Sequence, residues 1–246
     1  MDKKEMIYGT RAVMEAIRAG RQIERVFVQS GLKNELTQEL LALARKSHVP
    51  LAVIPQEKIN RMSTKNHQGV ICVLSAVQYA NLDHVVQGVF EQGRDPFVIV
   101  LDRITDMRNF GAIVRTAEGA GVDVIVVPEK GNAPVTADAM KTSAGALNFV
   151  PVARVRNLKE TVRDLRQRGL QVIAVTEKAQ ETLFEVDFRM PTVLLLGSEE
   201  DGISPELLRE ADRLALIPMK GKIESLNVSV SAGIAMYEFV RQKAGR

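Results

Sequence analysis

A chain of 246 residues, 46% hydrophobic and 26% charged with a net charge of +3, is long enough for one or two globular domains with a substantial core. No apolar stretch approaches the roughly 20 residues that span a bilayer, and the N-terminal MDKKEMIYGT lacks the apolar run of a signal peptide. One cysteine, Cys72, excludes an internal disulfide framework, and the scattered His48, His67 and His84 offer no metal-binding spacing, so we expect a cytoplasmic protein without membrane segments or metal.

The first 78 residues alternate between helical and extended patterns. TRAVMEAIRAG predicts a helix capped by Thr10 and ended by Gly20, and NELTQELLALARKS predicts a second helix capped by Asn34. The expected elements are helix 10–20, strand 23–29, helix 34–47, strand 49–55, helix 56–62 and strand 69–77. Together they predict a small α/β domain over residues 1–78.

Charge is distributed unevenly along the chain. Residues 1–80 contain 12 Lys and Arg against 7 Asp and Glu, whereas the remainder contains 21 against 23. A basic first region suits contact with phosphate groups, although a solvated basic surface without a partner would have the same composition.

Residues 79–95 interrupt the regular pattern. YANLDHVVQGVFEQGRDP contains one helical stretch and then a break at Gly93 and Pro96, so we place a linker at 79–95. Beyond it we expect strands at 97–103, 123–128, 148–155, 170–176, 192–197 and 213–219, and helices at 109–121, 135–145, 158–169, 205–211 and from about 226. Uninterrupted apolar strands such as VLLLG indicate burial on both faces, so residues 96–246 predict a parallel sheet covered by helices.

Polar stretches follow three of these strands, at the sheet edge where open α/β folds bind ligands. In LDRITDMRNFGAIVRTAEGAG, Asn109 predicts a helix cap, Gly111 allows close approach to the first helical turn, and Arg115 follows at helical spacing. A helix N-terminus beside an arginine attracts phosphate, but a capped surface helix with a solvated arginine would have the same sequence.

The second stretch, LLLGSEEDGIS, ends a buried strand at Gly197 and continues into an acidic turn that closes at Gly202. Glycines permit tight backbone geometry beside a ligand, and Glu199 directly follows the strand end. The stretch lacks the Lys-Ser/Thr pair of a phosphate-binding loop, and a plain hydrophilic turn is the alternative.

The third stretch, LIPMKGKIESLNVSVSAG, precedes the last helix. Ser225 predicts the helix cap and Asn227 then lies in the first turn, where two small polar groups can align a sugar hydroxyl or a carboxylate. An ordinary amphipathic helix capped by Ser225 is the alternative. Ser229, Ala232 and Gly233 keep the following helix thin, which suits close packing against another helix or a second subunit.

In combination, RNFGAIVRTAEGAG, LLLGSEEDGIS and IPMKGKIESLNVSVSAGIAMYEF resemble the three ordered motifs of the SpoU (TrmH-like) family of RNA ribose 2′-O-methyltransferases, which belongs to the knotted SPOUT class. The likeness covers about residues 96–243. The first region, from IYGTRAVMEAI to HQGVICVL, is similar to the small RNA-binding domain of the RlmB branch, whose substrate is a guanosine in the peptidyl-transferase region of 23S ribosomal RNA.

This resemblance implies an α/β-knot domain with a deep trefoil knot, S-adenosyl-L-methionine as cofactor and a homodimer packed through regions that include the last helix. The positions that match catalytic residues of the three motifs are Asn109, Arg115, Glu199, Ser225 and Asn227. The positions that match contacts to the methyl donor are Gly197, Ile217 and Leu226, whereas Glu200 and Asp201 receive no role.

The resemblance also implies a mechanism in which the ribose hydroxyl loses its proton during methyl transfer. The family's usual proton acceptor corresponds to Arg115, aided by an RNA phosphate. Because a guanidinium stays protonated, an alternative is that Arg115 clamps the phosphate while Glu199 acts as base or orienting partner. In the first domain, Arg11, Arg61 and Lys65 are expected to contact RNA phosphates.

The implied partner is 23S ribosomal RNA or a pre-ribosomal particle. Two other functions stay open at this point: 2′-O-methylation of transfer RNA or another ribosomal site, and RNA binding by an assembly factor without catalysis. The joint presence of the five motif residues favours an enzyme.

Overall fold

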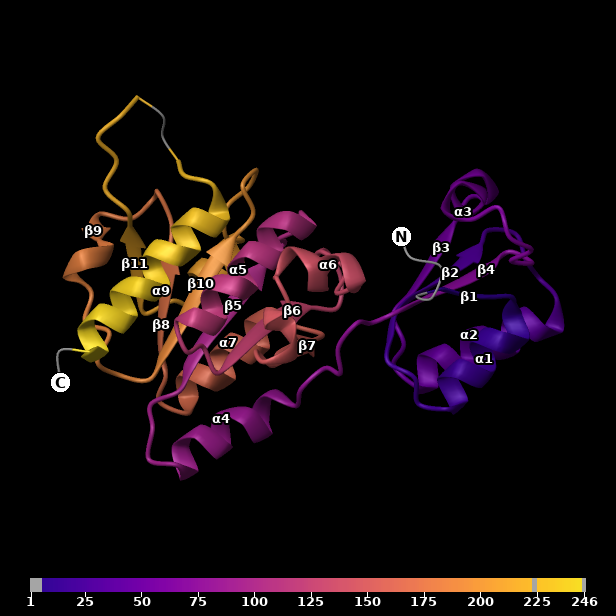
Figure 1. The fold of residues 1–246 in the computed structure, drawn as a ribbon, viewed down its shortest axis with the longest axis horizontal. Helices are drawn as coiled ribbons and strands as arrows, with labels where there is room; N and C mark the ends of the chain where they lie inside the picture. Colours follow the sequence, from indigo (N-terminus) through magenta and orange to yellow (C-terminus); the bar gives the residue numbers. More distant parts are fainter. Residues whose placement is uncertain (1–5, 223–224, 245–246) are drawn as a thin grey trace. The chain divides into compact units, whose positions relative to one another are not determined.

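The computed structural model describes residues 6–222 and 225–244; Ile223 and Glu224, in the predicted loop before the last helix, lie outside the described part. The chain divides into two compact units (Figure 1). One comprises residues 1–78 with 134–138, and the other comprises residues 79–133 with 139–246.

The first unit is built on a four-stranded sheet of order β1-β4-β2-β3. β2 pairs parallel with β3 and antiparallel with β4, and β1 pairs antiparallel with β4. The elements are β1 (Met6–Tyr8), α1 (Thr10–Arg18), β2 (Ile23–Gln29), α2 (Glu35–Lys46), β3 (Leu51–Ile54), α3 (Gln56–Met62) and β4 (Val70–Leu74). The three-residue β1 was not predicted, because its MIY is too short to show alternation.

A single hydrophobic cluster joins α1 and α2 to the sheet of this unit. Val13 from α1 and Leu40 from α2 pack with Val26 and Cys72 of the strands, and all four are fully buried. Burial raises the pKa of the Cys72 thiol to about 12, so this side chain is a packing residue rather than a reactive thiol.

The two predicted helix caps of the first unit have different outcomes. Asn34 caps α2, because its side-chain oxygen accepts a hydrogen bond from Thr37 N at 2.8 Å. The prediction for Thr10 is wrong: Thr10 is the first helical residue, and Gly9 occupies the cap position with φ 86°. The chain enters α1 through a left-handed backbone conformation, which favours glycine over a side chain that could cap.

The second unit contains a seven-stranded sheet of order β7-β6-β5-β10-β8-β11-β9. Every pairing among its described strands is parallel, as the continuous apolar strands predicted. The strands are β5 (Phe97–Asp102), β6 (Val124–Pro128), β7 (Val152–Val155), β8 (Gln171–Val175), β9 (Glu181–Thr182), β10 (Thr192–Gly197) and β11 (Arg213–Leu216). The helices are α4 (Leu82–Glu91), α5 (Met107–Gly119), η1 (Ala146–Asn148), α7 (Leu158–Gln167), η2 (Leu183–Glu185), α8 (Pro205–Leu208) and α9 (Val228–Ala244), and α6 (Ala137–Thr142) begins in the first unit and continues in the second.

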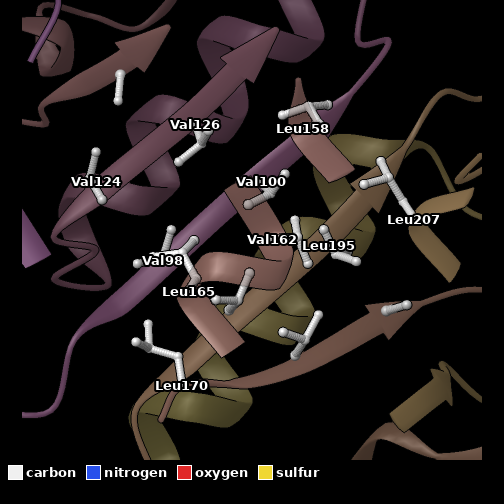
Figure 2. Packing of buried hydrophobic residues seen from close by; sticks show 14 of the residues in the cluster. Val98, Val100, Val124, Val126, Leu158, Val162, Leu165, Leu170, Leu195 and Leu207 are labelled. Atoms are coloured by element: carbon white, nitrogen blue, oxygen red, sulfur yellow. The ribbon is translucent and has the colours of Figure 1, made fainter. Parts of the chain in front are cut away.

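The sheet of the second unit is buried on both faces. Val98 and Val100 of β5 point into the cluster that α7 covers with Val162 (Figure 2). The intervening residues of β5 point the other way, where Phe97 stacks on Phe239 of α9 with 3.7 Å between ring centroids. β5 therefore lies in the centre of the domain. The loop that follows its C-terminal end lies at the border of the sheet, where a site can form.

Strand order brings distant parts of the chain together. After forming β8, the chain returns to the centre of the sheet as β10, between β5 and β8, and then passes outside β8 as β11 (Figure 1). The last residues of β5 and β10, Asp102 and Gly197, are paired. The loops that follow these two strands consequently start side by side, although the strand ends lie 95 positions apart along the chain.

The segment 79–95, assigned to a linker from its sequence, carries α4 in the second unit. Val86 of α4 is 1% exposed and belongs to the hydrophobic cluster of the large sheet. The apolar residues of this helix explain why it docks there rather than remaining extended.

Neither a membrane span nor a metal cluster is present among the described residues. None of the helices in the described part is long and apolar enough to cross a membrane. Within the same residues, no group of three His, Cys, Asp or Glu side chains is arranged to hold a metal ion.

Candidate active site

The loop after β10 folds back over the end of its own strand. A Cβ atom on Gly197 would lie 2.1 Å from the carbonyl carbon of Gly202 and 2.2 Å from the nitrogen of Ile203. Such distances are impossible for a side chain, so glycine is required by the close backbone approach. Ser198 bridges to Gly202, which closes the turn.

Three polar side chains from distant segments meet beside this turn, and we call Asn109, Glu199 and Asn227 the polar cluster. Glu199 Oε1 accepts hydrogen bonds from Asn109 Nδ2 at 3.1 Å, from Asn227 Nδ2 at 2.5 Å and from Val228 N at 3.3 Å. Asn227 Nδ2 also donates to Asn109 Oδ1 at 3.0 Å. The cluster thus ties the loop after β10 to the first turns of α5 and α9.

The helix caps at the site differ from the predicted ones. Asp106 caps α5 by accepting hydrogen bonds from Arg108 N at 2.6 Å and Asn109 N at 3.1 Å, so Asn109 is not the cap. Asn227, rather than Ser225, precedes α9 directly and accepts a hydrogen bond from Ser229 N at 3.0 Å. Because Asp106 caps α5, the side chain of Asn109 is available to the polar cluster.

Glu199 also lines a cavity of about 440 Å³. Its walls come from the ends of β8 and β10, from the loop after β10 and from the segment before α9. The lining residues are Val175, Thr176, Glu177, Lys178, Leu196, Gly197, Ser198, Glu199, Glu200, Asp201, Gly202, Ile203, Ile217, Met219, Ser225, Leu226, Val228 and Ser231. The three positions expected to contact the methyl donor, Gly197, Ile217 and Leu226, are all among them.

The remaining predicted site residues lie apart from the polar cluster. Ser225 is exposed and lines the cavity. Arg115 is exposed on α5, two turns beyond its start, and makes no hydrogen bond or ion pair within the described part of the chain. Gly111 admits a neighbouring segment rather than a ligand: an added Cβ would lie 2.1 Å from Thr142 Oγ1.

Two residues at the end of β5 were not predicted as part of the site. Asp102 is 5% exposed, and its Oδ2 accepts a hydrogen bond from Ser204 N at 2.7 Å. Arg103 Nη1 lies 2.9 Å from Asp201 Oδ2. Asp102 ends an apolar strand and Arg103 follows it, and this position was the only signal in the sequence. Their partners lie about 100 residues away along the chain, where no local pattern shows them.

Two families match the chain. The SpoU rRNA Methylase family matches residues 96–237, and a family described as RNA 2′-O ribose methyltransferase substrate binding matches residues 6–80.

Relatives align over nearly the whole chain. A 23S rRNA (guanosine-2′-O-)-methyltransferase RlmB from Ralstonia nicotianae is 33% identical, over 99% of this chain and 98% of its own length. The RlmB protein of Pseudomonas aeruginosa is 32% identical with the same coverage. YacO of Bacillus subtilis, whose name assigns it to the TrmH family of tRNA/rRNA methyltransferases, is 34% identical over 97% of this chain and 96% of its own length.

Solved structures share the fold. The SpoU methyltransferase AviRb from Streptomyces viridochromogenes, crystallised with AdoMet, superposes with a TM-score of 0.61 at 24% identity, over 98% of this chain and 91% of its own. An AdoMet-bound rRNA methyltransferase from Sinorhizobium meliloti has the same TM-score at 26% identity, over 96% of this chain and 87% of its own.

Proposed function

Because the chain belongs to the SpoU family of S-adenosylmethionine-dependent 2′-O-methyltransferases, we propose that it methylates the ribose 2′-hydroxyl of a guanosine in 23S ribosomal RNA. The observation that carries this proposal is the convergence of the three motif segments: Asn109, Glu199 and Asn227 bond to one another beside the cavity. The choice of 23S RNA is supported by the RlmB relatives, which align over 98% of their own length.

The cavity suits S-adenosylmethionine in size and chemistry. Its volume of about 440 Å³ lies within the range of small-molecule sites. Ile217, Leu226 and Val228 offer apolar surface to an adenine ring, while Glu177 and Glu199 offer carboxylates to cationic groups. When bound, this cofactor supplies an electrophilic methyl group on a sulfonium.

The residues around the cavity have distinct proposed roles. Asn109 and Ser225 orient the ribose, and Asn227 holds Asn109 and Glu199 while it caps α9. Arg115, which has no partner among the described residues, is available to clamp an RNA phosphate. Fixing the ribose in this way can lower the barrier by as much as about 7–11 kcal/mol.

Two candidates could receive the proton of the 2′-hydroxyl: the carboxylate of Glu199, and Arg115 together with an RNA phosphate. Glu199 Oε1 is surrounded by three donors, whereas Oε2 accepts no hydrogen bond from the described residues. If Oε2 takes the proton, Glu199→Gln will lose nearly all of kcat while cofactor affinity is retained, because an amide cannot accept that proton. If Glu199 only anchors the cluster, Glu199→Gln will retain much of kcat, because an amide oxygen still accepts hydrogen bonds from the same donors; the base is then sought at Arg115 and its phosphate.

We propose that the first unit holds the RNA. Arg11, Arg61 and Lys65 are exposed and form no ion pair with described residues, and Lys65 Nζ lies 4.9 Å from the centre of the Tyr8 ring. Removal of each cation that binds a phosphate should reduce the slope of log affinity against log salt by about 0.7–0.9. Arg11→Glu/Lys65→Glu with an unchanged slope would contradict this role, with Glu15→Gln as a surface control.

We propose a cytoplasmic homodimer, with free 23S RNA or a pre-ribosomal particle as its substrate. Apolar side chains remain exposed on α9, where Val230 is 49% and Tyr237 52% exposed, and Phe149 is 75% exposed. A second copy covering α9 would bury Val230 and Tyr237. Light scattering should give twice the chain mass for the wild type and the chain mass for Val230→Glu/Tyr237→Glu; a monomeric wild type would refute the dimer.

Mapping of ribose methylation tests the proposed function. In ribosomal RNA from a strain lacking this protein, one guanosine of 23S RNA should lose its 2′-O-methyl group, and the wild-type gene should restore it. The Asn109→Ala gene should restore it less completely, because its kcat is expected to be lower. An intact 23S pattern with a missing transfer RNA methyl group would instead favour the alternative suggested by the TrmH relative YacO, and an unchanged pattern in all RNA would favour a binding role.

A further inference from the structure

Arg103 connects two of the motif segments without lining the cavity. Its Nη1 donates to Asp201 Oδ2 at 2.9 Å and its Nη2 donates to the carbonyl oxygen of Gly202 at 3.1 Å. Its Nε lies 3.3 Å from Asp102 Oδ1. One guanidinium therefore ties the end of β5 to the middle of the turn after β10.

The backbone of Arg103 is held in an unusual conformation. Its φ of 60° lies in the left-handed region, which favours glycine. A bulky residue keeps such a conformation only where the surrounding structure requires it, and such positions gather at functional sites. The hydrogen bonds of the side chain give a reason for this conformation, because they hold the guanidinium against the turn after β10.

The turn that Arg103 holds belongs both to the cavity and to the polar cluster. Asp201 and Gly202 line the cavity, and Glu199, two residues earlier, is the centre of the polar cluster. Asp102 fixes the far end of the same loop through Ser204 N. The cluster holds the loop at Glu199, and the end of β5 holds it at residues 201–204.

We propose that Arg103 is a positioning residue, which holds the turn 198–202 in the shape that binds S-adenosylmethionine and presents Glu199. It acts through Asp201 and Gly202 rather than by touching cofactor or substrate. The inference rests on the proposed assignment of the cavity to the cofactor, and its test includes a measurement that does not depend on that assignment.

The test uses Arg103→Gly in the full chain. Glycine accepts the φ of 60°, so the fold should persist while all three tethers are removed. We expect faster hydrogen exchange at the amides of residues 199–202 without cofactor, and about tenfold weaker binding of S-adenosylmethionine by calorimetry. His48→Gly is the matched control, because His48 also has a positive φ, 54°, and lies in the first unit; exchange and affinity should not change.

Two further variants separate a tether from general destabilisation. Arg103→Lys keeps the charge, but an ammonium group lacks the planar guanidinium that bonds to Asp201 and Gly202 together. The affinity of this variant for S-adenosylmethionine should therefore lie between those of the wild type and Arg103→Gly. Asp201→Asn should weaken the binding of S-adenosylmethionine in the wild type. In the Arg103→Gly variant the same substitution should cause a smaller further loss of affinity, because the bond between the two residues is already absent.

Unchanged exchange at residues 199–202 together with unchanged affinity in Arg103→Gly would overturn the proposal. Full additivity of Arg103→Gly and Asp201→Asn would also overturn it. If the wild type binds S-adenosylmethionine but methylates no 23S guanosine, the proposed function fails while the role of Arg103 stands. If the wild type does not bind it at all, the exchange measurement alone decides.

Discussion

The two halves of the candidate site, which meet at Glu199, are built by different means. The cavity is shaped by backbone: Gly197 lies under Gly202 at a distance that admits no side chain. The polar cluster is made of side-chain hydrogen bonds among Asn109, Glu199 and Asn227. The cavity should therefore respond to changes in loop shape, and the cluster to the loss of single functional groups.

Gly197→Ala should have the largest effect, because it changes the backbone that shapes the cavity. The added methyl group would overlap Gly202 and Ile203, so the loop must move. We expect the unfolding free energy to fall by about 1–3 kcal/mol and S-adenosylmethionine affinity to fall by about 100-fold or more, measured by denaturant unfolding and calorimetry. Gly88→Ala is the control, because a Cβ there meets nothing within 4 Å; it should stabilise α4 by about 0.5–1 kcal/mol. Normal affinity in Gly197→Ala would show that the loop tolerates displacement.

Asn109→Ala tests the side-chain half. It removes partners of Glu199 and Asn227 but leaves the cap of α5 intact, because Asp106 provides it. We expect kcat to fall by roughly 30-fold, with cofactor affinity within about threefold and little change in Tm. Asp106→Ala should show the opposite pattern, a stability loss of about 1 kcal/mol and a smaller loss of kcat. Equal loss of stability in both variants would contradict the assignment of the helix cap to Asp106 and of the polar cluster to Asn109.

Arg115→Lys examines a residue that belongs to neither half. Lysine retains the charge but loses the planar fork, so we expect kcat/KM for RNA to fall about tenfold, with unchanged cofactor affinity. Arg115→Ala should lose more. If lysine is as damaging as alanine, two-point recognition by the guanidinium matters more than charge. If neither variant changes kcat/KM, Arg115 has no role in the reaction.

The smallest effect is expected at the far end of α9, away from the site. Glu238 is buried, and hydrogen bonds from Arg241 hold the pKa of its carboxyl below the ordinary 4.5. A lowered pKa in the folded state means that this carboxylate stabilises the fold above about pH 4.5 and that its contribution disappears as the pH falls further. The Tm difference between wild type and Glu238→Gln should therefore shrink between about pH 5 and pH 3. Glu15→Gln, in an exposed ion pair with Arg18, should show almost no difference at either pH.

Much of the fold was predictable from local pattern. The apolar run FVIVLD and the run TVLLLG predicted strands buried on both faces, and the all-parallel sheet confirms them. The errors are local as well: Thr10, Asn109 and Ser225 are all suitable capping residues, but the neighbouring Gly9, Asp106 and Asn227 take those positions. Capping preferences are shared by several residue types, so pattern alone cannot choose between close neighbours.

The amino-acid sequence by itself determined most of the longer strands and helices, though not the short β1 and β9, and it determined which three stretches carry polar residues at strand ends, because both depend on spacing along the chain. Tertiary structure alone decided that β10 lies beside β5, that one oxygen of Glu199 receives donors from α5 and α9, and that Arg103 reaches the turn after β10. These contacts join residues that are 28 to 118 positions apart. Their geometry follows from the order of strands in the sheet, to which no local pattern is sensitive.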